Sequence, residues 1–420
     1  MPDPLTVQLV NQTTSPNIFA FITGLAIHHH MARVFILPDS TPHYPASPPP
    51  GKILQPLTTP CAIPLGAPGN TVTLTIPPIA GGRIWFSAAT PLTFLRNPGG
   101  PGGGAALVEP SVLNPTDPNA AVDFAFCEFT RDAHQLFANV SYVDFVPRLP
   151  VALTLLTEGG AAVQHVSGLA GDGLRRVCEG LRAQGARDGW PWGRLVVEGP
   201  PGGEGGPGPL RALSPTHGAA VGARFEGFFE PLVEAAWRRY AERPGETPRR
   251  GLRMPMVSRG PDAAAGGGHG VLRINTQAAP GVLEGRVAAG SDELVIGGEA
   301  FARPTTADIL GCNSGPFTTG PSPKRNAIIP RLAAAFQRGC IADVDEHPSA
   351  PETFYRSEPS NHYSQIVHEC SLDGKGYAFA YDDVQPDGGA DQSGKVNAGD
   401  PKVFIVAVGG GGAYVGDRMP

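Results

Sequence analysis

The chain has 420 residues, which is enough for two or three ordinary domains or one large protein of two lobes with a sizeable core. Gly 56 and Pro 46 make up close to a quarter of it, but no Gly-X-Y period indicates collagen, and the 41% hydrophobic content excludes wholesale disorder. A net charge of −6 without a long basic run argues against a nucleic-acid-binding surface.

The sequence carries no sign of a membrane span or of a leader. No run of about 18 apolar residues is uninterrupted, so we expect no membrane association. The start, Met1–Pro4, lacks the basic and apolar regions of a signal peptide, so the chain either stays inside the cell or begins at its mature residue. The six cysteines lie far apart without zinc spacing; three disulfides and six buried thiols both stay open, and so does the compartment.

The first 160 residues predict a β-domain, because apolar or alternating runs are separated by turns rich in proline and glycine. The predicted strands are 5–10, 32–37, 71–76, 82–87, 122–130, 140–146 and 151–156. Turns such as Ser47–Pro50 and the glycine run 99–104 lie between them. An all-β sandwich or a flattened barrel is the expected architecture.

Residues 168–250 predict an inserted α/β segment. Apolar side chains recur at helical spacing over 169–181 and again over 225–237, with a short strand at 196–197 between them. The glycine-rich loop 199–209 lacks the Gly-Lys-Ser/Thr of a phosphate loop, so we interpret it as a mobile linker.

Strands return after the inserted segment, at 271–276, 281–287 and 292–296. A helix is expected over 327–338 with Leu332, Ala335 and Phe336 on its inner face. Two further strands, 377–381 and 403–408, close the chain, and we expect the last one to rejoin the first β-domain.

The strand 122–130 carries the first candidate catalytic group. Alternation places Glu128 on one face with Phe124, Phe126 and Thr130, and puts Asp123, Cys127 and Phe129 on the other. Two phenylalanine neighbours would disfavour the charged carboxylate, and a neutral carboxyl is what a general acid needs near neutral pH.

The next predicted strand carries the second group, because alternation puts Val140, Tyr142 and Asp144 on one face. If the two strands pair, Glu128 and Asp144 line one groove, and two carboxylates across a groove suit glycoside hydrolysis. The alternative is that both are solvated residues at strand ends.

Four motifs resemble the acidic-cleft segments of thaumatin-like proteins. They are Cys-Glu-Phe-Thr at 127–130 with Asn-Val-Ser-Tyr-Val-Asp at 139–144 and Leu-Pro at 149–150; His-Tyr-Ser at 362–364 with Cys370 and Tyr-Ala-Phe-Ala-Tyr-Asp-Asp at 377–383; Thr-Thr-Ala-Asp-Ile at 305–309; and Gly-Arg-Ile-Trp at 82–85. The length and the phrases at 105–111 and 312–317 make the chain similar to family-64 glycoside hydrolases, the laminaripentaose-producing β-1,3-glucanases, in a fungal-like version. The likeness covers residues 5–410 and is loose over 165–260.

The resemblance implies a mainly β protein: a thaumatin-like β-sandwich or barrel of residues 1–165 and 270–420 with an inserted mixed α/β domain, 166–269, and a wide groove between them. It implies endo-acting hydrolysis of β-1,3-glucan with inversion and release of short oligosaccharides, pentaose among them. Glu128 then matches the general acid and Asp144, sixteen residues later, the general base. Two carboxylates and water suffice, so no cofactor or metal is expected. The other expectations are a glucan polysaccharide partner, a monomer, and an extracellular location.

The remaining candidates for substrate binding have plainer alternatives. Arg83 either orients a carboxylate or makes a structural ion pair, and Asp132 either binds sugar or forms a turn. The other candidates are Thr130, Asn139, Tyr142, Asp308, Tyr363, Asp382 and Asp383, as cleft-lining or core positions. The run His28–His30 is interpreted as a solvated turn, and Trp190 and Trp192 as packing residues.

The sequence departs from the thaumatin-like pattern at two points: Asn139 stands where those proteins carry Asp, and six cysteines cannot build their eight-disulfide framework. Asn139 favours a competing hypothesis, a glucan-binding or defence protein of thaumatin-like fold without turnover. Both presumed catalytic carboxylates are nevertheless present, which favours the enzyme.

Overall fold

A computed structural model of the chain describes residues 4–99, 104–157, 163–199, 208–241, 270–276, 281–389 and 391–410. The chain divides into two compact units. Unit 1 comprises Met1–Ala223, Ile366–Ala378 and Asp391–Pro420, and unit 2 comprises Arg224–Gln365 and Phe379–Ala390. Mainly β architecture is confirmed, since strands are the larger part of the regular structure.

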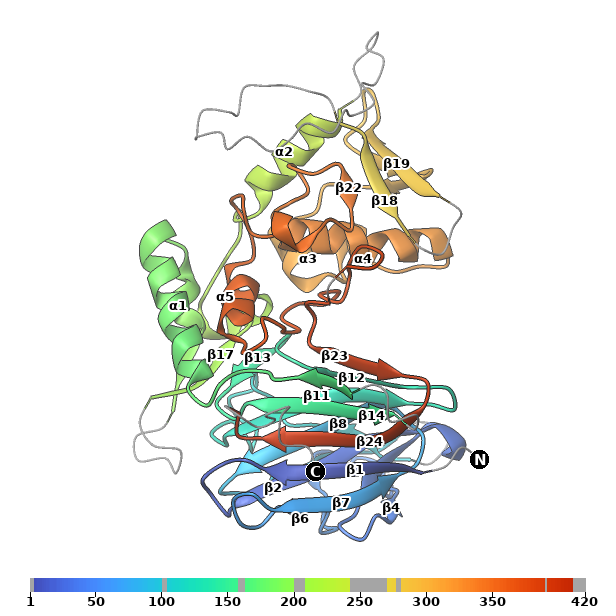
Figure 1. The fold of residues 1–420 in the computed structure, drawn as a ribbon, viewed down its shortest axis with the longest axis vertical. Coiled ribbons are helices and arrows are strands. Elements are labelled where there is room, and N and C mark those ends of the chain that lie inside the picture. The colour runs from blue at the N-terminus through green and yellow to red at the C-terminus, as the bar shows by residue number, and fades with distance from the viewer. Residues whose placement is uncertain are drawn as a thin grey trace. The chain divides into compact units, whose positions relative to one another are not determined.

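Two sheets form the body of unit 1 (Figure 1). The five-stranded sheet has the order β15 (Val163–Val166), β14 (Val151–Thr157), β24 (Pro401–Val408), β1 (Leu5–Asn11), β7 (Thr71–Ile76). The larger sheet has the order β23 (Lys395–Ala398), β12 (Leu136–Val140), β11 (Phe124–Arg131), β8 (Ile79–Ala88), β2 (Ile18–Ala26), β3 (Ala32–Ile36), β4 (Pro42–His43), with β6 (Ile63–Pro64) beside β2.

The core between these two sheets is apolar and closely packed. The ring of Phe129 on β11 lies 6.5 Å from that of Phe404 on β24, and both side chains are buried. Gly82 on β8 makes room for Phe129, because a Cβ at Gly82 would lie 2.5 Å from the phenyl ring. As predicted, the last strand rejoins the first β-domain: β24 lies between β14 and β1 and pairs with β1 in parallel.

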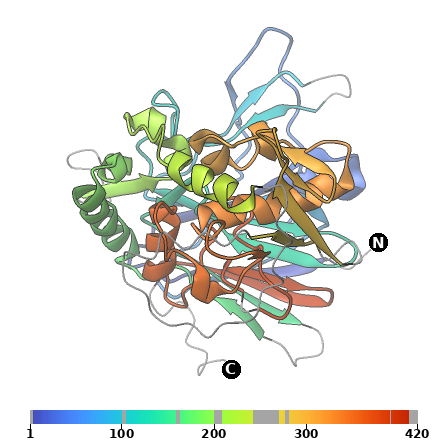
Figure 2. The same ribbon diagram turned by 90° about the horizontal axis from the view of Figure 1, so that it is seen from above.

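Two three-stranded sheets extend unit 1. One has the order β10 (Ala106–Val108), β9 (Leu95–Asn97), β5 (Gln55–Pro56), and is drawn in blue and cyan in Figure 2; the other has the order β13 (Phe145–Pro147), β17 (Pro209–Leu213), β16 (Val196–Glu198). Aromatic residues gather on the face of β8 and β11 that points away from the five-stranded sheet. This aromatic cluster contains Trp85, Phe94, Phe124, Phe126 and Phe145 among others, so it also includes a strand of the second small sheet.

The described part of unit 1 contains one α-helix predicted from apolar spacing, α1 (Gly173–Asp188), and three short helices that were not predicted, η1 (Ile27–His29), η2 (Pro191–Leu195) and η3 (Pro215–Val221). Helix α1 buries Leu174, Val177, Cys178 and Leu181, which recur every three or four residues and form one face. The C-terminal part of α5 (His362–Cys370) also belongs to unit 1.

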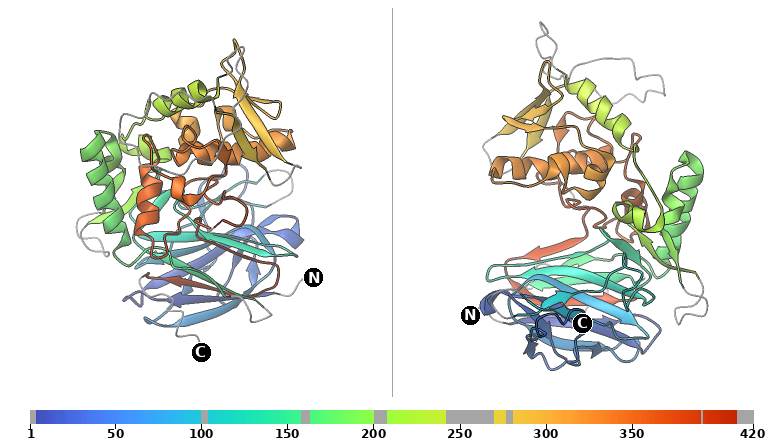
Figure 3. Two further views of the ribbon diagram at one scale, coloured as in Figure 1. Left: turned by 45° about the horizontal axis from the view of Figure 1, so that its top comes forward. Right: turned by 180° about the vertical axis from the view of Figure 1, so that it is seen from behind.

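Unit 2 is built on a five-stranded sheet flanked by helices (Figure 3). The strand order is β21 (Glu299–Phe301), β20 (Leu294–Ile296), β19 (Val282–Val287), β18 (Leu272–Asn275), β22 (Glu346–His347). The helices are α2 (Glu230–Tyr240), α3 (Thr306–Gly311), η5 (Gly315–Phe317), α4 (Pro323–Gln337) and η6 (Pro351–Thr353). The three residues expected on the inner face of α4 are all buried.

The expected domain boundaries at 165 and 270 differ from the two units. Strand β13 pairs with β17, which ties the segment up to residue 223 to unit 1 instead of to an insertion. Residues 270–365 form a sheet with their own helices and therefore separate from the first β-domain. Most of the predicted linker 199–209 lies outside the described residues.

Two predicted strands are wrong. The run 140–146 is not continuous, because β12 ends at Val140 and the N–H of Tyr142 donates instead to the carbonyl of Tyr377. The run 377–381 forms turns: the N–H of Asp382 donates to the carbonyl of Phe379, and Tyr381 has a φ of +71°. Side-chain alternation cannot reveal such turns, because apolar residues that pack in a core also alternate by chance.

The six cysteines are buried free thiols, so the disulfide alternative is wrong for this structure. Burial raises the pKa of the Cys61 thiol to about 11 and that of Cys178 to about 12, which keeps both protonated and unreactive. No helix in the described ranges is long and apolar enough to cross a membrane.

A largely buried carboxyl lies just before β11. The side chain of Asp123 is 11% exposed, and its Oδ2 lies 3.8 Å from Nε of Arg148. Burial raises the pKa of Asp123 to about 6, although the positive charges of Arg148 and Arg211 oppose the shift. The folded state therefore binds this proton more tightly than the unfolded chain does.

We expect Asp123→Asn to change how stability depends on pH. Because the folded pKa is raised, Asp123 contributes stability below pH 4 that is lost as the pH rises through 6. The variant has no carboxyl to titrate. Between pH 4 and 7, the difference in free energy of unfolding, variant minus wild type, should therefore increase by about 2–3 kcal/mol. Urea denaturation across this range checks it. Parallel curves for the two proteins would contradict the expectation, and the exposed Asp172→Asn is the control.

Candidate active site

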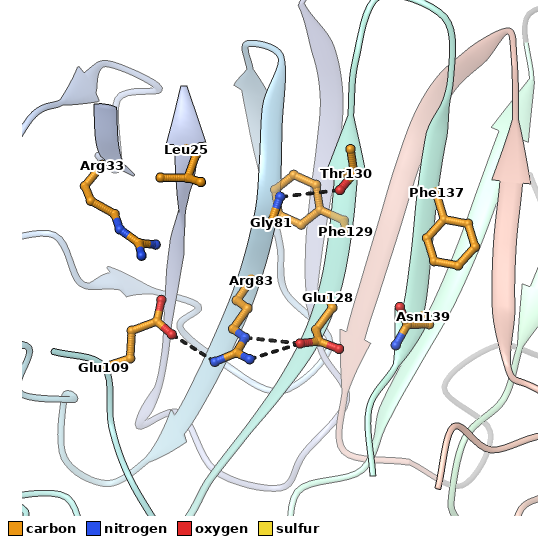
Figure 4. A pocket seen from close by; sticks show the side chains of 11 residues that line it. Leu25, Arg33, Gly81, Arg83, Glu109, Glu128, Phe129, Thr130, Phe137 and Asn139 are labelled. Atoms are coloured by element: carbon orange, nitrogen blue, oxygen red, sulfur yellow. Dashed lines mark hydrogen bonds and ion pairs between the residues drawn. The ribbon is translucent and has the colours of Figure 1, made fainter. Parts of the chain in front are cut away.

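A cavity of about 390 Å³ lies on the larger sheet, on the same face of β8 and β11 as the aromatic cluster (Figure 4). It is lined by Leu25, Arg33, Gly81, Gly82, Arg83, Glu109, Glu128, Phe129, Thr130, Phe137 and Asn139. The predicted face of β11 is confirmed: Phe124 and Phe126 enter the aromatic cluster, and Glu128 and Thr130 continue the same face into the cavity.

Three adjacent strands place the central side chains of the cavity in a row. Glu128 on β11 pairs with Arg83 on β8 and with Asn139 on β12. Directly opposed residues in an antiparallel sheet point to the same face and lie within contact distance. The sheet register therefore brings an arginine, a carboxylate and an amide together.

Arg83 binds two carboxylates. Its Nε and Nη2 donate to Oε1 of Glu128 at 3.2 and 3.1 Å, and its Nη1 donates to Oε2 of Glu109 at 2.8 Å (Figure 4). Below them, the guanidinium carbon lies 4.7 Å from the ring centre of Phe126 and 5.4 Å from that of Trp85. The sequence left two alternatives for Arg83, orientation of a carboxylate or a structural ion pair. Both are present, because the ion pair with Glu128 also orients that carboxylate.

The surroundings of Glu128 differ from those expected. The alternation pattern predicted that Phe126 would lie beside the Glu128 carboxylate. Phe126 packs against Arg83 instead, and the neighbour of the carboxylate is the positively charged guanidinium. The two Arg83 nitrogens that bind Glu128, Nε and Nη2, both donate to Oε1, and the side chain of Glu128 is 35% exposed. Within the described part of the chain, Oε2 accepts no hydrogen bond and is open to a bound molecule.

Asp144 lies on the segment between β12 and β13, not on a strand beside Glu128. Its Oδ1 lies 2.9 Å from Nε2 of His217, and its backbone carbonyl accepts from the N–H of Ser214. The side chain is 41% exposed. The predicted face of Val140, Tyr142 and Asp144 is therefore wrong, since the strand ends before Asp144 and the other two side chains are buried.

The electrostatics of Asp144 favour the ionised form. The hydrogen bond from His217 lowers the pKa of Asp144, burial opposes this, and the charges of His217 and Arg83 lower it further. Asp144 is therefore a carboxylate near neutral pH and can accept a proton. Arg83 acts on both carboxylates: it binds Glu128 directly, and its positive charge helps to lower the pKa of Asp144.

Two further predicted residues line the cavity. The Thr130 hydroxyl accepts from the N–H of Gly81 at 3.4 Å, and the Asn139 amide donates to the Val140 carbonyl at 2.9 Å. Asp132 does not line it: its Oδ1 accepts from the N–H groups of His134 and Gln135, which is the turn alternative.

Tyr142 is buried in the core of unit 1 and does not line the cavity. Burial raises the pKa of Tyr142 well above its ordinary value, and the negative charge of Asp373 adds to this. Of the two alternatives for Tyr142, a cleft-lining or a core position, the structure shows the core position.

The last four candidates belong to unit 2 and contribute nothing to this cavity. Asp308 caps α3 in a reciprocal box with Thr305; burial disfavours its charge, but hydrogen bonds from Ser314 and Thr305 lower the pKa of Asp308 overall. Tyr363 is fully buried. Asp382 is buried against Arg338 at 3.3 Å, and Asp383 is half-buried beside it in the chain.

The histidine run and the tryptophans agree with their plainer interpretations. Residues 28–30 are exposed at η1, and Trp192 is fully buried beside Trp190. The part of the chain that the structure describes holds no group of three or more side chains arranged to bind a metal.

Sequence reasoning missed three residues of the site: Arg33, Glu109 and His217. Glu109 and Arg33 line the cavity from the ends of short strands, where no pattern distinguishes them from solvated residues. His217 follows the Ser-Pro that caps η3, which predicts a helix start but does not connect it to a carboxylate 73 residues earlier. Only the sheet pairing of β13 with β17 reveals that contact.

The arrangement can carry out acid–base chemistry. It combines one carboxyl with a free oxygen facing a cavity and one ionised carboxylate held by a histidine in the same unit. The cavity also offers Arg33, Thr130 and Asn139 to hydroxyl-bearing molecules.

Comparisons with known proteins give a consistent result. The profile of glycoside hydrolase family 64, described as beta-1,3-glucanase, matches residues 3–247 and 269–408. A glucan endo-1,3-beta-glucosidase of Cellulosimicrobium cellulans is 27% identical over 343 residues, which cover 80% of this chain and 53% of that protein. The chain thus spans about half the length of the curated relatives it matches.

Solved structures share the fold. A laminaripentaose-producing beta-1,3-glucanase in complex with laminaritetraose superposes with a TM-score of 0.77 at 25% identity, covering 97% of this chain and 99% of the other. A beta-1,3-glucanase domain from Clostridium beijerinckii gives 0.67 at 20% identity over 96% and 98% of the two chains. With the family profile matching most of its length, the chain belongs to glycoside hydrolase family 64, the beta-1,3-glucanase family.

Proposed function

We propose that this chain hydrolyses β-1,3-glucan internally and with inversion, with Glu128 as the general acid and Asp144 as the general base. The observation that carries the proposal is that unit 1 holds two differently bound carboxyl groups: Glu128, bound by Arg83, lines an open cavity, and Asp144 is bound by His217. Membership of family 64 supports this choice among the reactions that two carboxylates can catalyse.

In the proposed reaction, the carboxyl of Glu128 gives its proton to the glycosidic oxygen as the bond from this oxygen to the anomeric carbon breaks. Asp144 takes a proton from a water molecule, whose oxygen bonds to the opposite face of the same carbon. An inverting pair stands ~6.5–9.5 Å apart to leave room for the water. Arg83 would hold Glu128 in place throughout, because its hydrogen bonds go to Oε1 and leave Oε2 to act on the substrate.

The substrate class is inferred from relatives. A similar solved enzyme carries laminaritetraose and is described as laminaripentaose-producing, so we propose that this chain also binds laminari-oligosaccharides and releases short products with pentaose among them. The cavity's mixture of arginine, threonine and amide groups suits sugar hydroxyls.

Several expectations stay predictions. They are the thaumatin-like relationship, the fungal-like membership, a monomeric state, an extracellular location, and a role for further parts of the chain in a substrate groove. Sugar contacts by Asp132, Tyr142, Asp308, Tyr363, Asp382 and Asp383 also stay predictions; Asp132 lies in a turn, and Tyr142, Tyr363 and Asp382 are buried.

The competing hypothesis is a glucan-binding protein without turnover, favoured by Asn139 in the cavity where thaumatin-like proteins carry Asp. The Asn139 amide already donates to a neighbouring carbonyl, which indicates a structural contribution. Incubation with laminarin distinguishes the two hypotheses: released oligosaccharides support the enzyme, and binding without release supports the alternative.

We expect Glu128→Gln to abolish most hydrolysis of laminarin while binding persists. Gln keeps the shape, but its amide is far too weak an acid to deliver a proton, and loss of general-acid catalysis costs roughly 10²–10⁴-fold in rate. Reducing-sugar release measures the rate, and affinity electrophoresis in laminarin measures binding. The exposed Glu179→Gln on α1 is the matched control and should keep wild-type turnover. More than half of wild-type turnover in Glu128→Gln would remove Glu128 from the role of acid.

We expect Asp144→Asn to lose activity almost completely and azide to restore it, because azide replaces the water that the base would activate. The product should be an α-glycosyl azide. Proton NMR in the first minutes of wild-type digestion should show the α-anomer at the new reducing end. An initial β-anomer would contradict inversion, and unaltered turnover in Asp144→Asn would contradict the assignment of the base.

A further inference from the structure

His217 has no part in the proton transfers proposed above, but it makes the one side-chain hydrogen bond described for Asp144. We propose that His217 is a positioning residue that fixes the Asp144 carboxylate in its ionised form, with Oδ2 turned toward the attacking water. The inference rests on the proposed function of Asp144 and adds a residue to it.

Two hydrogen bonds connect Asp144 to the segment that begins η3, one to its backbone and one to its side chain. Strand pairing of Phe145 with Leu213 continues into a hydrogen bond from the Ser214 N–H to the Asp144 carbonyl at 2.9 Å. Three residues later, Nε2 of His217 reaches Oδ1 of Asp144, also at 2.9 Å. Backbone and side chain of the same residue are therefore bound by one short segment, which leaves the carboxylate little freedom to rotate.

The segment that carries His217 is itself well held. The Ser214 hydroxyl accepts from the Thr216 N–H, Pro215 occupies the first position of η3, and the N–H of His217 donates to the Ser214 carbonyl. Gly218 is buried, and a Cβ there would lie 2.4 Å from the Ala223 carbonyl oxygen. The side chain of His217 is 22% exposed, so its ring has a restricted set of positions.

The hydrogen bond also decides which oxygen acts as the base. A proton on Nε2 of His217 points to Oδ1, and a carboxylate oxygen engaged by a donor is less basic than the free one. Oδ2 is then the oxygen available for the proton of the water. Either the neutral ring with its proton on Nε2 or the imidazolium can make this bond, so the role does not require His217 to change charge.

Among the charged and titratable groups that act on Asp144, His217 is the one that donates a hydrogen bond to its carboxylate. From β8, Arg83 acts on Asp144 through its charge, but its donor nitrogens bind Glu128 on β11 and Glu109 after β10. The side-chain hydrogen bond of His217 has the largest effect in keeping Asp144 ionised, ahead of these longer-range charges. Removal of His217 should leave Asp144 folded in place but looser and easier to protonate.

The test compares His217→Gln with His217→Asn. The amide nitrogen of Gln can occupy the position of Nε2, whereas Asn carries the same amide one methylene shorter and cannot reach Oδ1. We expect His217→Asn to lower kcat on laminarin roughly ten- to a hundredfold with KM within about twofold, and His217→Gln to recover most of that loss. The acid limb of the kcat/KM profile should move to higher pH in His217→Asn and stay near wild type in His217→Gln.

Controls separate the inference from the function on which it rests. In the Asp144→Asn background, His217→Asn should cause no further loss, because the group that it positions is already gone. If Asp144→Asn is inactive while His217→Asn keeps wild-type kcat and acid limb, the inference is overturned and the proposed function stands. If Asp144→Asn is active, the proposed function itself fails. Circular dichroism confirms folding, and equal losses in the Gln and Asn variants would reduce His217 to a packing role.

Discussion

The Arg83 guanidinium organises the candidate active site. It is mostly withdrawn from water, with a side chain 29% exposed, so its charge needs acceptors within the protein. Glu128 and Glu109 supply them, and the faces of Phe126 and Trp85 hold the planar group from below. A one-residue slip of β11 along β8 would move Phe126 and Glu128 to the face opposite Arg83, so the register of this strand pair fixes the geometry of the acid.

Much of this arrangement follows from local sequence. Alternation alone placed Phe124, Phe126 and Glu128 on one face of a strand, and the structure has them there. Recurring apolar positions also predicted α1 and α4, because a helix that buries one face needs apolar residues every three or four positions. Such patterns report which face of an element is buried, and they do so without knowledge of its neighbours.

The rest depends on contacts between distant segments. The sequence around Asp144 alternates like a strand, yet β12 ends at Val140. Beyond it, the backbone groups of Tyr142 and Asp144 hydrogen-bond to those of Tyr377 and Ser214. The same pairing of β13 with β17 moved the domain boundary from 165 to 223. Hydrophobic periodicity could not predict Glu109 or His217 for the same reason. Their partners, Arg83 and Asp144, are distant in the sequence and lie beside them only in the folded chain.

The place of β24 has a consequence for the order in which the protein is made. This strand lies between β1 and β14, so the five-stranded sheet is split in two until residues 401–408 exist. The β1–β7 pair and the β14–β15 pair can form early, but neither meets the other without the strand that separates them. A ribosome therefore releases nearly the whole described chain before this sheet can close. Until then one backbone edge of β1 and one of β14 have no β24 partner, and an unpaired strand edge is a site at which a growing chain can associate with its neighbours.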